Sequence, residues 1–254
     1  MKEAKAMAYV NMYGVLATLE NLCAMDKPAQ AVLAQLKSPV RLCFSVKDGP
    51  CCTFHFTREG CRMTEGDQDA TCKMHFSSPE KFNALIDDSK PGLPVKRPAQ
   101  VLSFLMGPFT ALTNRLTELL RPSAEALKDP AFFEESTLLT MYTIAGAISA
   151  LANTDPISKI SASNTVDGQV QLGIAGKVAV TVLVKDHHFT TIKAPADNPR
   201  AIMEFASVQL AHDLFNGQAA TMNEMCKGNI RLKGMISMVD NINRILDRVS
   251  VYLA

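Results

Sequence analysis

Residues 226–235 read Cys-Lys-Gly-Asn-Ile-Arg-Leu-Lys-Gly-Met, and they decide how the second half of the chain is interpreted. Apolar and polar side chains alternate between Gly228 and Gly234, which is typical of a short strand with one buried face. Gly234 then lets the chain turn, because glycine adopts left-handed backbone conformations without a steric penalty. The sequence therefore predicts a short strand between two glycines with a sharp turn at its end.

An amphipathic helix is expected after this turn, running to Leu253. Its apolar positions recur every three or four residues, as they do on one face of an α-helix. They are Met235, Met238, Val239, Ile242, Ile245, Leu246, Val249 and Leu253. A half-buried strand that leads into a methionine-rich helix suits the wall of an apolar pocket, and it suits an ordinary core equally well.

The composition is that of a globular protein. Of the 254 residues, 47% are hydrophobic and 20% are charged, which is enough apolar material for a core. The net charge is +1, and neither half has the excess of Lys and Arg that phosphate backbones require, so we expect no nucleic-acid partner. No apolar run is long enough to span a bilayer. Seven cysteines without an export signal indicate reduced thiols in a cytoplasmic protein.

The first half predicts helices and an antiparallel β-meander. Helices are expected at 3–24 and 28–36, strands at 41–46, 51–57, 61–64 and 70–76, a helix capped by Ser78-Pro79, a proline-rich link at 89–98, and a long helix over 102–119 that Gly107-Pro108 interrupts. The second half predicts a helix at 138–151, extended segments at 157–166, 169–174, 178–184 and 189–193, and a helix from Asn198-Pro199 to Phe215.

Four short landmarks recur in the same order in the two halves, at separations between 119 and 129 residues. They are Met12-Tyr13 with Met141-Tyr142, Asp48-Gly49 with Asp167-Gly168, Ser78-Pro79 with Asn198-Pro199, and Asn114-Arg115-Leu116 with Asn243-Arg244-Ile245. The shared order predicts an internal duplication. Coincidence between two α+β segments is the alternative.

With its glycine-flanked strand and methionine-rich helix, the chain resembles the end of the sterol-binding domain of the sterol carrier protein family. The likeness is clearest over residues 135–254 and reaches residues 1–125 only through the repeat. In the first half, residues 92–98 stand where the glycine-flanked strand belongs, and Pro94 and Pro98 remove backbone donors that a strand needs.

We therefore expect an α+β protein with two similar lobes, each an antiparallel-rich mixed sheet covered by helices. The expected domains are a diverged sterol-carrier-like lobe at 1–125 and a lobe at 126–254 that holds the glycine-flanked strand and the closing helix.

The resemblance implies non-catalytic binding or transfer of a lipid, fatty acid, acyl-CoA or sterol-like molecule in a cavity between sheet and helices. The thirteen methionines agree with an adaptable apolar surface, although each of them fits a core gap as well. The expected lining is Met203, Phe205, Ile230, Leu232, Met235, Met238 and Ile242. No cofactor is expected, and transient contact with a membrane and association of identical chains stay open.

An interaction module with a filled core is the alternative function. A void of about 300 Å³ or more beside Met203 and Met238 would favour ligand binding over this alternative. The basic set Arg231, Lys233, Arg244 and Arg248 is interpreted as a solvated face paired with Asp240 and Asp247, and contact with an anionic headgroup is the less favoured interpretation.

Neither a metal site nor a catalytic residue is predicted. The cysteines and histidines between Cys51 and His75, and the pair His187-His188, lack the spacings typical of zinc ligands. The chain also lacks a Gly-x-Ser-x-Gly elbow, a Walker loop and a Gly-x-Gly-x-x-Gly segment. We therefore expect a protein that is not an enzyme.

Overall fold

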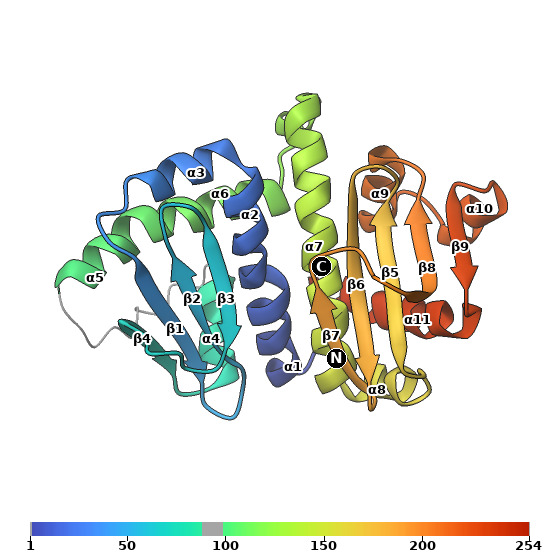
Figure 1. Cartoon of the computed structure of the whole chain (residues 1–254), viewed down its shortest axis with the longest axis horizontal. Coiled ribbons are helices and arrows are strands. Elements are labelled where there is room, and N and C mark those ends of the chain that lie inside the picture. The colour runs from blue at the N-terminus through green and yellow to red at the C-terminus, as the bar shows by residue number, and fades with distance from the viewer. Residues whose placement is uncertain (1, 88–98, 254) are drawn as a thin grey trace. The chain divides into compact units, whose positions relative to one another are not determined.

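The computed structural model describes residues 2–87 and 99–253, and the chain forms two compact units (Figure 1). Unit 1 comprises Glu3–Glu135 and unit 2 comprises Ser136–Ala254. The proline-rich link at 89–98, with the segment at 92–98 that takes the place of the glycine-flanked strand, lies outside the described residues.

Unit 1 consists of a four-stranded sheet and the helices that cover it (Figure 1). Its elements are α1 Ala4–Tyr9, η1 Val10–Val15, η2 Leu16–Thr18, α2 Leu19–Met25, α3 Lys27–Ala34, β1 Val40–Val46, β2 Cys51–Phe56, β3 Cys61–Glu65, β4 Cys72–Phe76, α4 Pro79–Ile86, α5 Ala99–Phe104, η3 Leu105–Phe109, α6 Thr110–Leu120 and η4 Ala126–Lys128. The expected interruption of the long helix is confirmed, because the π-helical turn η3 contains Pro108, which has no backbone donor.

The sheet of unit 1 has the order β3-β2-β1-β4, with β4 parallel to β1. The expected antiparallel meander is therefore wrong in its last strand. The outer edge of β3 is already occupied, because the Met63 N–H donates a hydrogen bond to Glu20 Oε1 of α2 at 2.6 Å. The last strand instead joins the other edge, beside β1. The predicted inner face of β2 is confirmed, since Cys52, Phe54 and Phe56 are fully buried.

Unit 2 contains a five-stranded sheet. Its elements are the part of α7 Pro130–Thr154 from Ser136 onward, α8 Pro156–Ser163, β5 Gly168–Ile174, β6 Val178–Lys185, β7 His188–Ile192, β8 Pro199–Phe205, α9 Val208–Phe215, α10 Thr221–Cys226, β9 Ile230–Gly234 and α11 Ile236–Leu253. The sheet order is β7-β6-β5-β8-β9, and β5 and β8 run parallel. The glycine-flanked strand and the closing helix are thus confirmed as β9 and α11. No helix within the described part of the chain is both long and apolar enough to cross a membrane.

The extended segment expected at 157–166 is wrong, because this stretch begins with helix α8. Asp155 caps the helix by accepting a hydrogen bond from the Ser158 N–H at 2.9 Å, and Pro156 occupies the first turn. An acidic N-cap followed by proline is a strong start signal for a helix. This start signal outweighs the preference of the segment's β-branched residues for a strand.

The helix expected to open at Asn198-Pro199 is also wrong at its start. Residues Pro199–Phe205 form strand β8, and helix α9 begins only after Ser207, whose side chain accepts a hydrogen bond from the Leu210 N–H at 3.2 Å. Pro199 is the first residue of this strand, a position at which proline is tolerated. Met203 and Phe205 therefore lie on a strand.

The two units share one strand order, β3-β2-β1-β4 and β7-β6-β5-β8, each with a parallel pair in the same place. The helix caps Ser78 and Ser207 correspond, and their numbers differ by 129, as do those of the caps Asp26 and Asp155. The landmark that matches Ser78-Pro79 with Asn198-Pro199 is therefore wrong. The duplication stays a prediction, which the common topology favours.

Two mixed sheets with covering helices confirm the expected α+β class.

Candidate functional site

The predicted lining residues are brought together at one end of the sheet in unit 2. Strands β8 and β9 pair antiparallel, so Met203 lies opposite Leu232 and Phe205 lies opposite Ile230. Side chains of directly opposed residues point to the same face of a sheet. Helix α11 packs on these two strands and adds Met238 and Ile242. Residues that the sequence places 40 positions apart therefore form one apolar layer between sheet and helix.

The layer passes from a buried interior to a half-buried rim. Met203, Phe205 and Ile230 are at most 4% exposed, and Met238 and Ile242 are each 1% exposed. Leu232 and Met235 are half-buried, at the end of β9 and at the turn into α11. The layer therefore reaches the surface at the turn between β9 and α11.

Gly234 fixes the geometry of that turn. Its φ is +80°, and a Cβ at this position would lie 2.1 Å from the carbonyl oxygen of Arg200. The next residue, Met235, donates its N–H to the same oxygen at 2.8 Å. A side chain at 234 would clash with β8, so only glycine lets the chain turn this close to the sheet. The start of β9 is held by Glu224 Oε2, which accepts a hydrogen bond from Asn229 Nδ2 at 2.7 Å.

A buried ion pair anchors α11. Arg248 Nη2 lies 3.2 Å from Asp155 Oδ1, and Tyr252 donates its hydroxyl to the same oxygen at 2.9 Å. Burial alone would raise the pKa of Asp155, but the hydrogen bonds from Arg248, Ser158 and Tyr252 outweigh it and lower the pKa to about 2. The carboxylate that caps α8 thus also holds the closing helix.

This pair corrects the interpretation of the basic set. Arg244 does pair with Asp240 on the exposed side of α11, at 3.1 Å. Arg248 instead points inward to Asp155 across 93 residues of chain. The sequence pattern does not reveal this direction. Arg248 follows Arg244 by one helical turn and is therefore expected on the same side of α11, and the spacing of charges does not distinguish a buried partner from an exposed one.

Unit 1 has larger side chains at four matched positions of its interior, although Cys61, opposite Phe56, is smaller than Phe189, opposite Val184. Phe44 pairs with Met74 of the parallel strand, just as Leu172 pairs with Met203 in unit 2. The strand registers match Phe44, Phe54 and Phe56 of unit 1 with Leu172, Val182 and Val184 of unit 2. Phe82 matches Ala211, because each lies four residues after the serine that caps its helix.

The rings of unit 1 contact one another, with centroids 5.8 Å apart for Phe44 and Phe54 and 6.3 Å apart for Phe44 and Phe82. At these four positions the sheet face and its covering helix therefore carry aromatic rings in unit 1 and aliphatic side chains in unit 2.

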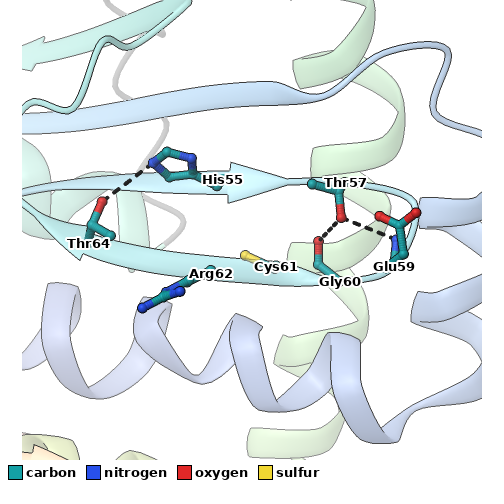
Figure 2. Close-up of a pocket in the computed structure, with 7 residues that line it drawn as sticks. All are labelled: His55, Thr57, Glu59, Gly60, Cys61, Arg62 and Thr64. Carbon is teal, nitrogen blue, oxygen red and sulfur yellow. Dashed lines mark hydrogen bonds between the residues drawn. The ribbon is translucent and has the colours of Figure 1, made fainter.

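A shallow hollow of about 480 Å³ lies on the β2–β3 hairpin of unit 1 (Figure 2). Its lining is His55, Thr57, Glu59, Gly60, Cys61, Arg62 and Thr64. The hydroxyls already have partners, because Thr57 Oγ1 accepts the Glu59 N–H at 3.2 Å and Thr64 Oγ1 lies 3.5 Å from His55 Nε2. The hollow is wide open and contains none of the predicted lining residues.

Within residues 2–87 and 99–253, no group of three or more His, Cys, Asp or Glu side chains is placed to hold a metal ion. Cys51 and His55 lie on the same face of β2, where alternate residues share a face.

No family model matches the chain, and no curated protein matches it. Similar solved structures include a ubiquinone synthesis protein described as UbiJ-SCP2, at 16% identity and a TM-score of 0.33, covering 42% of this chain and 94% of that one. A sterol carrier protein 2 matches at 16% identity and a TM-score of 0.34, covering 43% of this chain and 92% of that one. Sterol Carrier Protein 2 Like 2 from Aedes aegypti matches at 12% identity and a TM-score of 0.32, covering 42% and 93%.

All three structures are described as sterol carrier protein 2 or as related to it, and the resemblance of a segment of this chain to the sterol carrier proteins is confirmed to that extent. At these identities the likeness is one of fold alone, over less than half of the chain.

Proposed function

We propose that unit 2 binds an apolar or amphipathic small molecule of the lipid, fatty acid, acyl-CoA or sterol-like class, without a catalytic step. The ligand lies between the sheet face of β5, β6, β8 and β9 and the helices α9 and α11. The walls of the proposed site are the predicted lining residues. The entrance to the site is the half-buried rim at Leu232 and Met235.

The difference between the two interiors carries this proposal. Where four phenylalanines fill unit 1, unit 2 has Leu172, Val182, Val184 and Ala211 on the same fold. At these four positions unit 2 fills less of its interior with its own side chains, which favours a ligand there, because protein interiors otherwise pack to crystal-like density. The methionines at 203 and 238 supply walls that adapt to ligand shape.

The first test is extraction of the purified protein with organic solvent, followed by mass spectrometry and by titration with a fluorescent fatty acid. We expect a co-purified lipid, or saturable binding of the fatty acid with a rise in melting temperature. An empty protein that binds none of a panel of fatty acids, sterols and acyl-CoAs would refute the proposal.

A plug variant tests the location of the site. Ala211→Phe introduces into α9 the ring that Phe82 provides in unit 1, so we expect at least about a tenfold loss of fatty-acid affinity. Gln209→Phe is the matched control, because it places the same ring on the exposed side of the same helix. Equal affinity of Ala211→Phe and the unaltered protein would place the ligand elsewhere. Circular dichroism checks that both variants fold.

Exposed apolar residues on α8 favour a second candidate, an interaction module. Ile157 is 53% exposed and Ile160 is 65% exposed, and the two lie one helical turn apart. Replacing both with serine should leave fatty-acid binding unchanged if the pocket is the functional site. Loss of a pulled-down partner in that double variant, with no lipid bound to the unaltered protein, would favour the interaction module.

A further inference from the structure

Two cysteines meet on the outer face of the sheet in unit 1. Cys43 on β1 and Cys51 on β2 are diagonal neighbours, because Cys43 pairs with Thr53 and Cys51 pairs with Ser45. Their side chains point away from the phenylalanine core, since residues alternate along each strand. The two Sγ atoms are 3.9 Å apart. An S–S bond is about 2 Å long, so the two sulfur atoms must move about 2 Å closer to form one.

The two thiols differ in accessibility. Cys51 is half-buried and can meet a small oxidant, whereas Cys43 is 1% exposed. Burial, and then the neighbouring Cys51, raise the pKa of Cys43 to about 12, although a hydrogen bond with Thr53 opposes this. Cys43 therefore stays protonated and reacts poorly with an oxidant in solution. Because Cys43 lies next to Cys51, the effective concentration of the Cys43 thiol is high at the Cys51 sulfur and nowhere else.

We propose that Cys51 and Cys43 form a peroxide-oxidisable dithiol, in which Cys51 reacts first and Cys43 resolves the product into an intramolecular disulfide. Hydrogen peroxide oxidises the Cys51 thiolate to a sulfenic acid and is itself reduced to hydroxide. The Cys43 sulfur then attacks the Cys51 sulfur, the S–O bond breaks, and the Cys43 proton leaves with the hydroxide as water. Two thiols and one peroxide thus yield one disulfide and two waters.

This arrangement protects Cys51 from irreversible oxidation. A sulfenic acid without a nearby thiol proceeds to sulfinic acid when peroxide is in excess. With Cys43 at 3.9 Å, closure of the disulfide competes with that step, and a dithiol reductant restores the starting state. The proposal is independent of ligand binding, which is assigned to unit 2.

The experiment uses the full reduced chain, treated with about one equivalent of hydrogen peroxide, alkylated, digested and mapped by mass spectrometry. We expect a peptide pair joined through Cys43 and Cys51, with the loss of two alkylatable thiols per chain, and full reversal by dithiothreitol. Cys51 as sulfinic acid beside a free Cys43 thiol in the unaltered protein would overturn the proposal, as would a disulfide between Cys51 and Cys226 of a second chain.

Variants separate the two roles. In Cys51→Ser, Cys43 should remain reduced at the same dose, whereas in Cys43→Ser a sulfenic acid should accumulate at Cys51 and be trapped by dimedone. Cys226→Ser is the matched control, because it removes an exposed thiol of unit 2 and should leave the cross-link yield unchanged. Should Cys43→Ser fail to fold, the peptide map of the unaltered protein still decides between the two outcomes.

Discussion

At the scale of single residues, one aspartate in each unit performs two tasks. Asp155 caps α8 and binds Arg248 of the closing helix, and Asp26 caps α3 and accepts a 2.8 Å hydrogen bond from Arg115 of α6. A carboxylate satisfies the free N–H groups of a helix start and pairs well with a guanidinium. Each pair therefore fastens a short helix to a later helix of the same unit.

We expect Asp155→Asn to lower the free energy of unfolding by about 3 kcal/mol near neutral pH, because it leaves a largely buried guanidinium without its counter-charge. The pKa of Asp155 is lowered to about 2 in the folded protein, compared with about 3.9 in an unfolded chain. Its stabilisation is therefore complete above about pH 4 and is lost as the pH falls toward 2. Urea unfolding from pH 7 to pH 2 should show the two proteins converging below about pH 4.

The exposed pair Asp240–Arg244 on the same helix provides the control. Asp240→Asn should cost less than about 1 kcal/mol, since solvent screens both side chains. Similar losses in the two variants, or a loss in Asp155→Asn that stays constant down to pH 2, would contradict the assigned role of Asp155.

At the scale of elements, β9 and α11 depend on the turn at Gly234. The strand ends against β8, and the chain must reverse beside the Arg200 carbonyl before α11 can return across the sheet. The other flanking glycine, Gly228, also has a positive φ of 79°, but no atom lies within 4 Å of a Cβ built there. The two glycines therefore have different physical roles despite their symmetrical places in the sequence.

We expect Gly234→Ala to destabilise the protein by more than about 3 kcal/mol, because the methyl group adds a clash with β8 to the cost of a positive φ. Gly228→Ala should cost only about 1 kcal/mol, from backbone strain alone. Urea unfolding measures both losses, and hydrogen exchange should show faster exchange in β9 for the first variant only. Equal losses would mean that the close approach to Arg200 is relieved by movement of the turn.

At the scale of the whole molecule, two units with one strand order have different interiors. Unit 1 has contacting phenylalanine rings in its interior, and unit 2 has smaller side chains at four matched positions. A common topology thus accommodates either a self-filled core or, as we propose, a ligand. The four matched strands pair in the same order in both units, and the difference on which the proposal rests lies in the size of side chains at four positions of the interior.

We expect Phe82→Ala to destabilise the protein by about 3–5 kcal/mol, since it leaves a cavity among buried rings in unit 1. Its affinity for a fluorescent fatty acid should stay unchanged, because the proposed site lies in unit 2. Denaturant unfolding and fluorescence titration measure the two quantities. Phe82→Leu, as the milder control, should cost much less, and a loss of fatty-acid binding in Phe82→Ala would argue against a site confined to unit 2.

Much of the candidate site follows from local sequence patterns. Alternation between Gly228 and Gly234 predicts β9, and the three-to-four spacing of apolar residues after Met235 predicts α11. These patterns suffice because the signals lie within a few residues of one another. Met203 and Phe205 were expected beside them, but on a helix, because Asn198-Pro199 resembles a helix start.

Local patterns in the sequence were enough to predict the class of fold, the closing strand and helix, and which faces are apolar, since periodicity is a local property. Tertiary packing decided that 199–205 is a strand, because its extended form depends on pairing with both β5 and β9. It likewise decided that Arg248 faces Asp155 and that Cys43 faces Cys51. Such contacts join elements that no local pattern relates, so they become visible only when the strands and helices are packed.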